Sequence, residues 1–192
     1  SFNFMASRIV ALLEQEKDKV RMEEELKVAK LVQDSFFPAT RLSVGRLEIA
    51  SFYTPSSECG GDWWSVLRSG NKSLLLIGDA TGHGVPAALI TATAASGCAT
   101  VEELAKENPQ LLESPAKILG ILNSAVYGAA QGKILMTFFA ILVDPDKGRV
   151  LYSNASHNSP YLYQLKDKDP DKKDLKPLVD AVGFRLGHKP DA

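Results

Sequence analysis

Two aspartates in similar glycine-rich contexts are the residues whose spacing points most directly to chemistry. Asp62 follows a pair of glycines, and Asp79 follows the apolar run 74–77 and one further glycine. If these segments form adjacent antiparallel strands, the two carboxylates converge on one hard cation. Carboxylate and backbone carbonyl oxygens suit Mg²⁺ or Mn²⁺, which keeps several waters and leaves a position for a phosphate. The pattern therefore predicts a metal site built on Asp62 and Asp79.

The glycine-rich corner after Asp79 has three other interpretations. The spacing of Gly82, Gly84 and Ala87 is also found in dinucleotide sites, but those need a second acid-ending strand about twenty residues on, and a helix is expected there instead. A phosphate-binding P-loop needs a lysine where His83 stands. In the third interpretation, the corner is a tight turn in which Asp79 only caps the following helix.

The histidines add little to this site at the level of sequence. His83 lies beside the acids in the chain, where it could assist a leaving group or hold a neighbouring side chain by a hydrogen bond. Ser156 and His157 form no catalytic dyad, because neighbouring residues of a strand point to opposite faces.

The elements that position these residues follow from apolar runs and turn signals. Run 74–77 predicts a strand buried on both faces, since a half-exposed strand would alternate. A hairpin turn is expected at 68–71. Further strands are expected at 47–54, 62–67, 134–143, 150–153 and 161–165, and helices at 86–107 and 115–130. Ser114 is the expected N-cap of the second helix. Strands, a helix pair and more strands predict an α+β layered domain with antiparallel sheets.

The N-terminal segment is expected to be one long helix over residues 4–34, which contain no glycine or proline. Its apolar side chains, such as Ile9, Leu13 and Val20, form a broken seam beside many charges. We expect residues 1–34 to be a helical stalk that pairs in parallel as a homodimer, with residues 35–192 as the domain it carries. The alternative is a single solvated helix. The charged run 166–176 is expected to be a loop.

Composition excludes some classes of function. The 192 residues contain 22 Lys and Arg against 23 Asp and Glu, which argues against nucleic acid as a partner. Cys59 and Cys98 are too few for a disulfide framework and fit a reducing cytoplasm. No run approaches the eighteen or so uninterrupted apolar residues of a transmembrane helix.

Short segments from about residue 29 to the C-terminus carry a resemblance to a known family. They are Gly-Gly-Asp at 60–62, Gly-Asp-Ala-Thr-Gly-His-Gly-Val-Pro-Ala-Ala-Leu at 78–89, and the segments 32–38, 136–139, 144–145, 154–158 and 183–187. Together they resemble the metal-dependent serine/threonine phosphatases of the SpoIIE/RsbU type, a bacterial branch of the protein phosphatase 2C superfamily (PPM). Residues 1–9 resemble the end of the second helix of a HAMP signalling linker.

The resemblance implies a layered α-β-β-α sandwich with antiparallel sheets and hydrolysis of phosphoserine or phosphothreonine on a protein. It implies a binuclear Mn²⁺ or Mg²⁺ centre in which Asp79 bridges the ions, Ala80 lends its backbone carbonyl and Asp62 binds directly or through water. The family's substrates are commonly anti-anti-sigma (STAS) proteins. With the HAMP-like start, we expect the cytoplasmic part of a receptor that is anchored in the membrane upstream.

The sequence also departs from the family pattern. Ser65 stands where an acid is usual, and Ser156 stands where a glycine is usual. The later threonine-aspartate-glycine motif and the final aspartate have no counterpart before Ala192. We therefore expect a fragment of a longer protein that binds metal weakly by itself. The alternative function is a catalytically inactive pseudophosphatase, or a dimerisation and scaffold module.

Overall fold

The computed structural model describes residues 2–55, 58–165, 171–180 and 182–190. A long helix leads into a domain of antiparallel strands with two helices. The elements in chain order are α1 (Phe2–Asp34), β1 (Arg41–Val44), β2 (Leu47–Ala50), β3 (Asp62–Ser69), β4 (Lys72–Ala80), α2 (Val85–Glu107), η1 (Pro109–Glu113), α3 (Pro115–Ala130), β5 (Met136–Asp144), β6 (Arg149–Ala155), β7 (Tyr161–Tyr163), η2 (Lys172–Asp174) and β8 (Leu175–Pro177).

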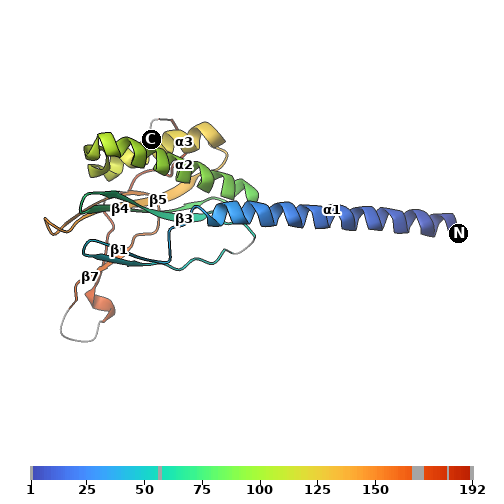
Figure 1. The fold of residues 1–192 in the computed structure, drawn as a ribbon, viewed down its shortest axis with the longest axis horizontal. Helices are drawn as coiled ribbons and strands as arrows, with labels where there is room; N and C mark the ends of the chain where they lie inside the picture. The colour runs from blue at the N-terminus through green and yellow to red at the C-terminus, as the bar shows by residue number, and fades with distance from the viewer. Residues whose placement is uncertain (1, 56–57, 166–170, 181, 191–192) are drawn as a thin grey trace.

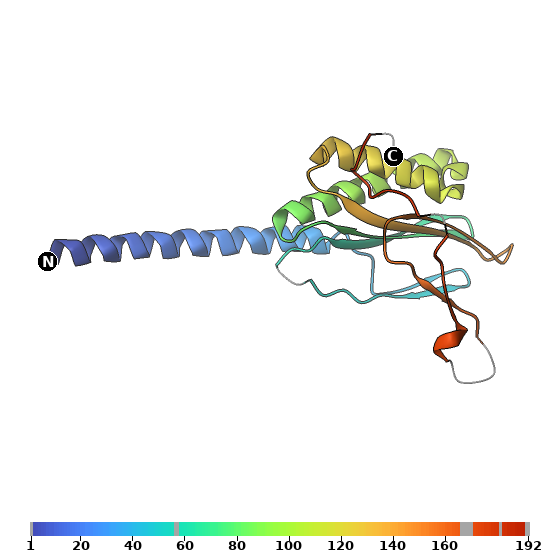
Figure 2. The same cartoon turned by 180° about the vertical axis from the view of Figure 1, so that it is seen from behind.

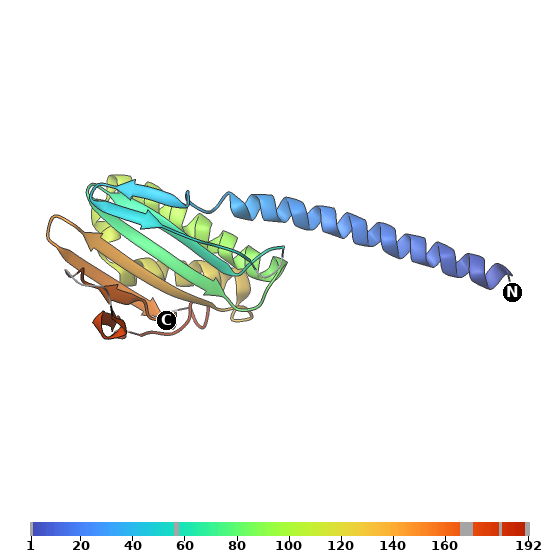
Figure 3. The same cartoon turned by 90° about the horizontal axis from the view of Figure 1, so that it is seen from below.

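Helix α1 extends away from the domain, as all three overall views show (Figures 1, 2 and 3). Its 33 residues span about 50 Å at 1.5 Å per residue. Only its last turns reach the domain, where Gln33 is buried, while Ile9 and Leu13 are 57% and 65% exposed. The predicted helix over 4–34 is confirmed. The division into a stalk at 1–34 and a domain at 35–192 stays a prediction.

The central sheet has four strands in the order β3-β4-β5-β6, and every neighbouring pair is antiparallel. β3 and β4 form a hairpin in which Ser69 pairs with Lys72, so the turn contains only Gly70 and Asn71. Gly70 has a φ of +59°, the conformation that a type II′ hairpin turn requires at its first central residue. The hairpin expected at 68–71 is therefore confirmed.

Helices α2 and α3 both cover one face of this sheet (Figure 1). Ile90 and Ala94 of α2 and Ile118 and Leu122 of α3 are buried in a core that also contains Phe138 of β5. Ser114 caps α3 by accepting a hydrogen bond from the backbone N–H of Lys117, as predicted. The predicted α+β class with antiparallel sheets is confirmed.

The opposite face of the sheet is partly exposed, which contradicts the prediction for run 74–77. Run 74–77 was expected to be buried on both faces, yet burial alternates along β4: Leu74 and Leu76 are buried, while Ile77 is 48% exposed. The reason is that the helices cover one face, and the other carries the small two-stranded sheets β1–β2 and β7–β8 (Figure 3). An apolar groove of about 460 Å³ separates these sheets from the central one.

Two loop and strand predictions also need correction. The strand expected at 47–54 ends at Ala50, and it pairs with β1, which was missed because Arg41–Val44 is short and partly polar. The run 166–176 is not a plain loop: its residues 166–170 lie outside the described residues, and the rest forms η2 and most of β8.

Within the described residues, α2 is a helix long and apolar enough to cross a membrane, judged by length and composition. This helix was expected at 86–107, but threonine, serine and glycine interrupt its apolar residues, so it contains no long uninterrupted apolar run. The packing of α2 against the sheet and α3 accounts for its apolar character. Gly97 allows close contact with α3, because a Cβ there would lie 2.9 Å from a methyl carbon of Leu122.

Candidate active site

Asp62 and Asp79 lie directly opposite each other in the β3–β4 pair. Side chains of directly paired residues share one face of a sheet, with Cβ atoms typically about 5 Å apart. Their chain neighbours Trp63 and Ala80 are buried in the core on the helix side, so the two carboxylates project from the other face. The structure thus brings together the two acids that sequence analysis selected.

Thr137 of β5 continues this row, because it pairs with Asp79 on the other side. Its hydroxyl donates a hydrogen bond of 3.4 Å to the backbone carbonyl of Asp79. The same hydroxyl shares a hydrogen bond of 2.8 Å with Nδ1 of His157. His157 therefore belongs to the acids' face of the sheet.

The backbone around His157 is held by Asn154, which is 1% exposed. Asn154 Oδ1 accepts from the N–H of His157 at 2.7 Å, and its Nδ2 donates to the His157 carbonyl at 3.0 Å. Between them Ser156 has a φ of +57°, in the left-handed region. This conformation favours glycine, the residue that the family resemblance led us to expect there. The Ser156 hydroxyl donates to the Gly183 carbonyl at 2.7 Å.

From the sequence, His157 was excluded only as a partner of Ser156, and His83 was the histidine expected beside the acids. The structure instead couples His157 electrostatically to both aspartates. The available signal was the resemblance of segment 154–158 to a family motif. The pairing that brings His157 to Thr137, which lies opposite Asp79, is not visible in local periodicity.

The charges of the acid pair oppose each other. Burial raises the pKa of Asp62, the nearby negative charge of Asp79 raises it further, and His157 acts in the other direction. Burial lowers the pKa of His157, although both aspartates favour its charged form. Two facing carboxylates with this mutual repulsion form a site that a cation would stabilise.

The oxygen atoms beside Gly61, the residue before Asp62, are also of the kind that binds a hard cation. A Cβ on Gly61 would lie 2.5 Å from the Ala80 carbonyl oxygen and 3.2 Å from Oδ1 of Asp79, so only glycine fits there. The Ala80 N–H donates to the Gly61 carbonyl at 3.0 Å. The three predicted ligand residues, Asp62, Asp79 and Ala80, are therefore neighbours. No group of three or more His, Cys, Asp or Glu side chains that could hold a metal occurs in the part of the chain that the structure describes.

The loop after Asp79 is anchored on both sides. The N–H of Thr81 donates to the Leu135 carbonyl at 2.8 Å, and the Thr81 hydroxyl accepts from the Leu135 N–H at 3.0 Å. Gly84, with a φ of +73°, is the N-cap of α2, and its N–H donates to the Cys59 carbonyl.

This geometry decides between the interpretations of the corner. The N-cap of α2 is Gly84 and shows no side-chain cap bond, so Asp79 does not cap the helix. The dinucleotide interpretation fails because β4 pairs antiparallel with both of its neighbours, whereas that motif requires a parallel unit.

Ser65 lies on the other side of β3 from Asp62. It pairs with buried Leu76, and the alternate residues Trp63 and Leu67 both enter the core, so Ser65 faces the helices. An acid at this position would not join the row of Asp62 and Asp79. The departure at residue 65 therefore leaves the acid pair unchanged.

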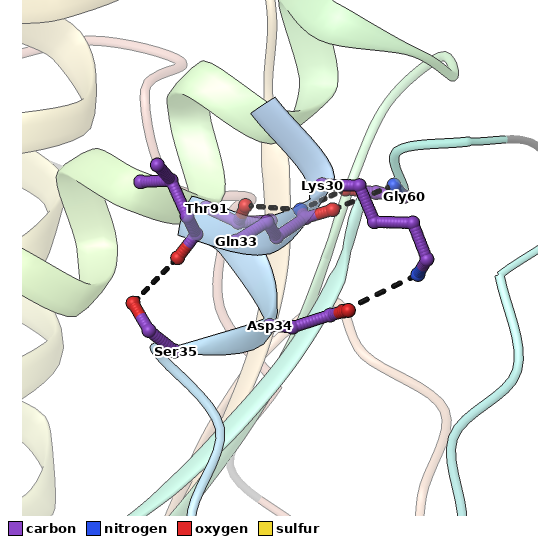
Figure 4. Close-up of polar contacts among 7 residues, drawn as sticks. Lys30, Gln33, Asp34, Ser35, Gly60 and Thr91 are labelled. Carbon is purple, nitrogen blue, oxygen red and sulfur yellow. Dashed lines mark hydrogen bonds and ion pairs between the residues drawn. The ribbon is translucent and has the colours of Figure 1, made fainter. Parts of the chain in front are cut away.

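The end of α1 contacts the backbone next to Asp62 through Gln33 (Figure 4). Gln33 Nε2 donates to the Gly60 carbonyl at 2.7 Å and to the Thr91 hydroxyl at 3.0 Å, and its Oε1 accepts from the Gly60 N–H at 3.0 Å. One buried side chain thus joins α1, the loop before β3 and α2.

Comparisons with known proteins agree with this fold. The chain is 24% identical over 169 residues to the phosphoserine phosphatase RsbU of Bacillus subtilis (strain 168), covering 88% of this chain and 48% of RsbU. It therefore spans about half the length of that curated relative.

Two solved structures share the fold. The SiaA-PP2C domain of Pseudomonas aeruginosa superposes with a TM-score of 0.65 at 19% identity, covering 90% of this chain and 65% of that one. The RsbU and RsbW domains of Rv1364c from Mycobacterium tuberculosis give a TM-score of 0.53 at 21% identity, covering 70% and 34%. The family model of Stage II sporulation protein E (SpoIIE) matches residues 69–189. Since this match covers more than half of the sequence, the chain belongs to the SpoIIE family.

Proposed function

We propose that this chain is the catalytic module of a metal-dependent phosphatase that hydrolyses phosphoserine or phosphothreonine on a protein. The observation that carries the proposal is the pairing of Asp62 with Asp79 next to the Ala80 carbonyl, in the space that Gly61 leaves open. Membership of the SpoIIE family and the similarity to a phosphoserine phosphatase support it.

In this proposal Asp62, Asp79 and the Ala80 carbonyl would hold Mn²⁺ or Mg²⁺ in a binuclear centre. Such ions lower the pKa of a bound water and neutralise charge on the phosphoryl oxygens. The chain itself fixes the donors: Thr137 holds the Asp79 backbone, and the β3–β4 register sets the spacing of the acids. Burial lowers the pKa of His157, and its Nδ1 shares a hydrogen bond with the Thr137 hydroxyl. Nε2 is then the nitrogen that would hydrogen-bond to substrate.

The wider setting is also part of the proposal. The family resemblance supports an anti-anti-sigma (STAS) protein as substrate and a cytoplasmic location in a receptor with a HAMP linker and an upstream membrane anchor. The exposed apolar residues of α1, including Ile9, Leu13 and Val20, support a homodimer through a parallel coiled coil.

A second candidate is a pseudophosphatase that keeps the fold without turnover. The observation that favours it is the donor count: the described residues bring only two carboxylates to the corner. Family enzymes surround their ions with about four carboxylates, and Mg²⁺ gives up its waters only to a well-supplied oxygen site.

The test is turnover of p-nitrophenyl phosphate and of a phosphoserine protein in Mn²⁺, Mg²⁺ or EDTA, using the full-length protein. We expect metal-dependent turnover that falls at least about 100-fold in Asp79→Asn, through loss of metal activation. Asp18→Asn, an exposed acid on α1, is the matched control and should retain activity. An inactive wild-type protein would favour the pseudophosphatase, and an active Asp79→Asn protein would refute the proposed site.

A further inference from the structure

The row of residues across the sheet continues beyond Thr137 onto the C-terminal segment. Met136 and Leu186 form an antiparallel bridge with both of its hydrogen bonds: Met136 N–H to the Leu186 carbonyl at 3.0 Å, and Leu186 N–H to the Met136 carbonyl at 2.8 Å. In an antiparallel pair, the residues one step further along are again opposite each other. This register places Arg185 opposite Thr137, so the row reads Asp62, Asp79, Thr137, Arg185.

Alternation places the Arg185 side chain on the face that carries the acids. Leu186 and Met136 are buried in the core under the helices. Successive residues of an extended segment point to opposite faces, so Arg185 projects with Asp79 and Thr137. Arg185 is exposed, and among the described residues it makes no hydrogen bond or ion pair.

The backbone on both sides of Arg185 is fixed although its side chain is free. On one side, the Gly183 N–H donates to the Asn154 carbonyl at 2.7 Å, and the Gly183 carbonyl accepts from Ser156. On the other, the N–H of Gly187 donates to Oδ1 of buried Asn123 at 2.8 Å. These contacts hold the backbone of Arg185 at a set position beside the site, while its cationic side chain is exposed.

We propose that Arg185 binds the phosphate group of the substrate during the phosphatase reaction, an inference that rests on the proposed function. Two strand spacings separate Arg185 from Asp79, about 10 Å, which an extended arginine crosses in large part by reaching over Thr137. A guanidinium presents paired N–H donors that match two phosphate oxygens. The guanidinium would hold the phosphate oxygens nearest to Thr137, while the ester bond to be hydrolysed lies beside Asp62 and Asp79.

Nearby lysines are less suited to this role. Lys189 Nζ lies 5.1 Å from the centre of the Phe184 ring, so its charge is already engaged in a cation–π contact. Lys133 lies in the turn after α3, outside the strand row. Arg185 is the cation that the register places in line with both aspartates.

The experiment measures inorganic phosphate binding by calorimetry, in Mn²⁺, to the full-length protein and to Arg185→Ala, Arg185→Lys and Arg68→Ala. Arg68 is an exposed arginine opposite Ser73, at the other end of β3, and serves as the matched control. We expect phosphate affinity to fall about 10- to 100-fold in Arg185→Ala, as for loss of charged hydrogen bonds, to recover in part in Arg185→Lys, and to stay unchanged in Arg68→Ala. Mn²⁺ affinity should be the same in all four proteins.

The KM for the phosphoprotein should rise in parallel with the loss of phosphate affinity. If wild type hydrolyses the phosphoprotein but Arg185→Ala binds phosphate equally well, the role of Arg185 is refuted and the proposed function stands. If wild type neither hydrolyses phosphate esters nor binds phosphate in Mn²⁺, both proposals fail. A loss of phosphate affinity in Arg68→Ala as large as in Arg185→Ala would show general charge attraction and would also overturn the assignment.

Discussion

The side-chain amide of Gln33 is hydrogen-bonded to both the N–H and the carbonyl of Gly60. The Gln33 amide accepts from the Gly60 N–H at 3.0 Å and donates to the Gly60 carbonyl at 2.7 Å, although 27 residues separate them in sequence. Gly60 lies two residues before Asp62. The last turn of α1 is therefore part of the support of the candidate active site.

Replacing Gln33 by leucine should destabilise the domain. The substitution keeps an apolar side chain of similar length but leaves the buried N–H and carbonyl of Gly60 without partners, at a cost of about 1–3 kcal/mol. Urea unfolding should show the loss, with Gln15→Leu, an exposed glutamine on the same helix, as the control. Equal midpoints for Gln33→Leu and wild type would mean that the contact adds nothing to stability.

Replacing Asp62 by asparagine should stabilise the metal-free protein at neutral pH. The folded state raises the Asp62 pKa above the ordinary 3.8, so the folded protein binds this proton more tightly than the unfolded chain. Asp62 therefore lowers stability as pH rises through its unfolded and then its folded pKa, and it has no such effect below both. In EDTA, Asp62→Asn should melt higher than wild type at pH 7, and the difference should vanish at acid pH.

Mn²⁺ should narrow or reverse this difference in melting temperature between the two proteins. If Asp62 is a ligand, Mn²⁺ should raise the melting temperature of wild type more than that of Asp62→Asn, because binding to the folded state alone adds stability. A shift of the same size in both proteins would show that Mn²⁺ binds without Asp62.

Replacing Gln131 by glycine should stabilise the protein by about 0.5–1 kcal/mol. Gln131 ends α3 in the left-handed conformation with a φ of 49°, its side chain is exposed, and glycine adopts this conformation without strain. Thermal unfolding measures the gain. Gln131→Ala is the control and should show no gain, since alanine is strained at the same φ.

Placing charge on the α1 seam should abolish self-association. The double variant Ile9→Asp, Leu13→Asp should be monomeric by light scattering, because both side chains are exposed on the isolated helix and would be buried only between copies. Ala11→Asp with Gln15→Asp changes the opposite side of the helix and should remain dimeric. A monomeric wild-type protein would reject the coiled-coil stalk.

Features that depend on a local sequence pattern could be predicted from the sequence. Repeated glycine-aspartate contexts identified Asp62 and Asp79, and turn chemistry predicted the hairpin that pairs them. Ile77 was misjudged because an apolar run does not show which face the helices cover. His157 and Gln33 were missed because they contact Thr137 and Gly60, beside the acids, through pairing between distant segments, which leaves no periodic signal in the chain. Arg185 was missed for the same reason, since only the bridge between Met136 and Leu186 places it opposite Thr137.

The two-residue turn at Gly70 and Asn71 governs a site at the far end of its hairpin. Seven residues of β3, about 23 Å, lie between Asp62 and the turn, yet the turn sets which residue of β4 faces each residue of β3. One inserted residue would move Asp79 out of line with Asp62, or rotate the acid of one strand toward the helices. Insertions or deletions in this exposed turn should therefore disturb the protein more than substitutions do. Selection for catalytic activity should then keep the length of a turn that does not contact the substrate.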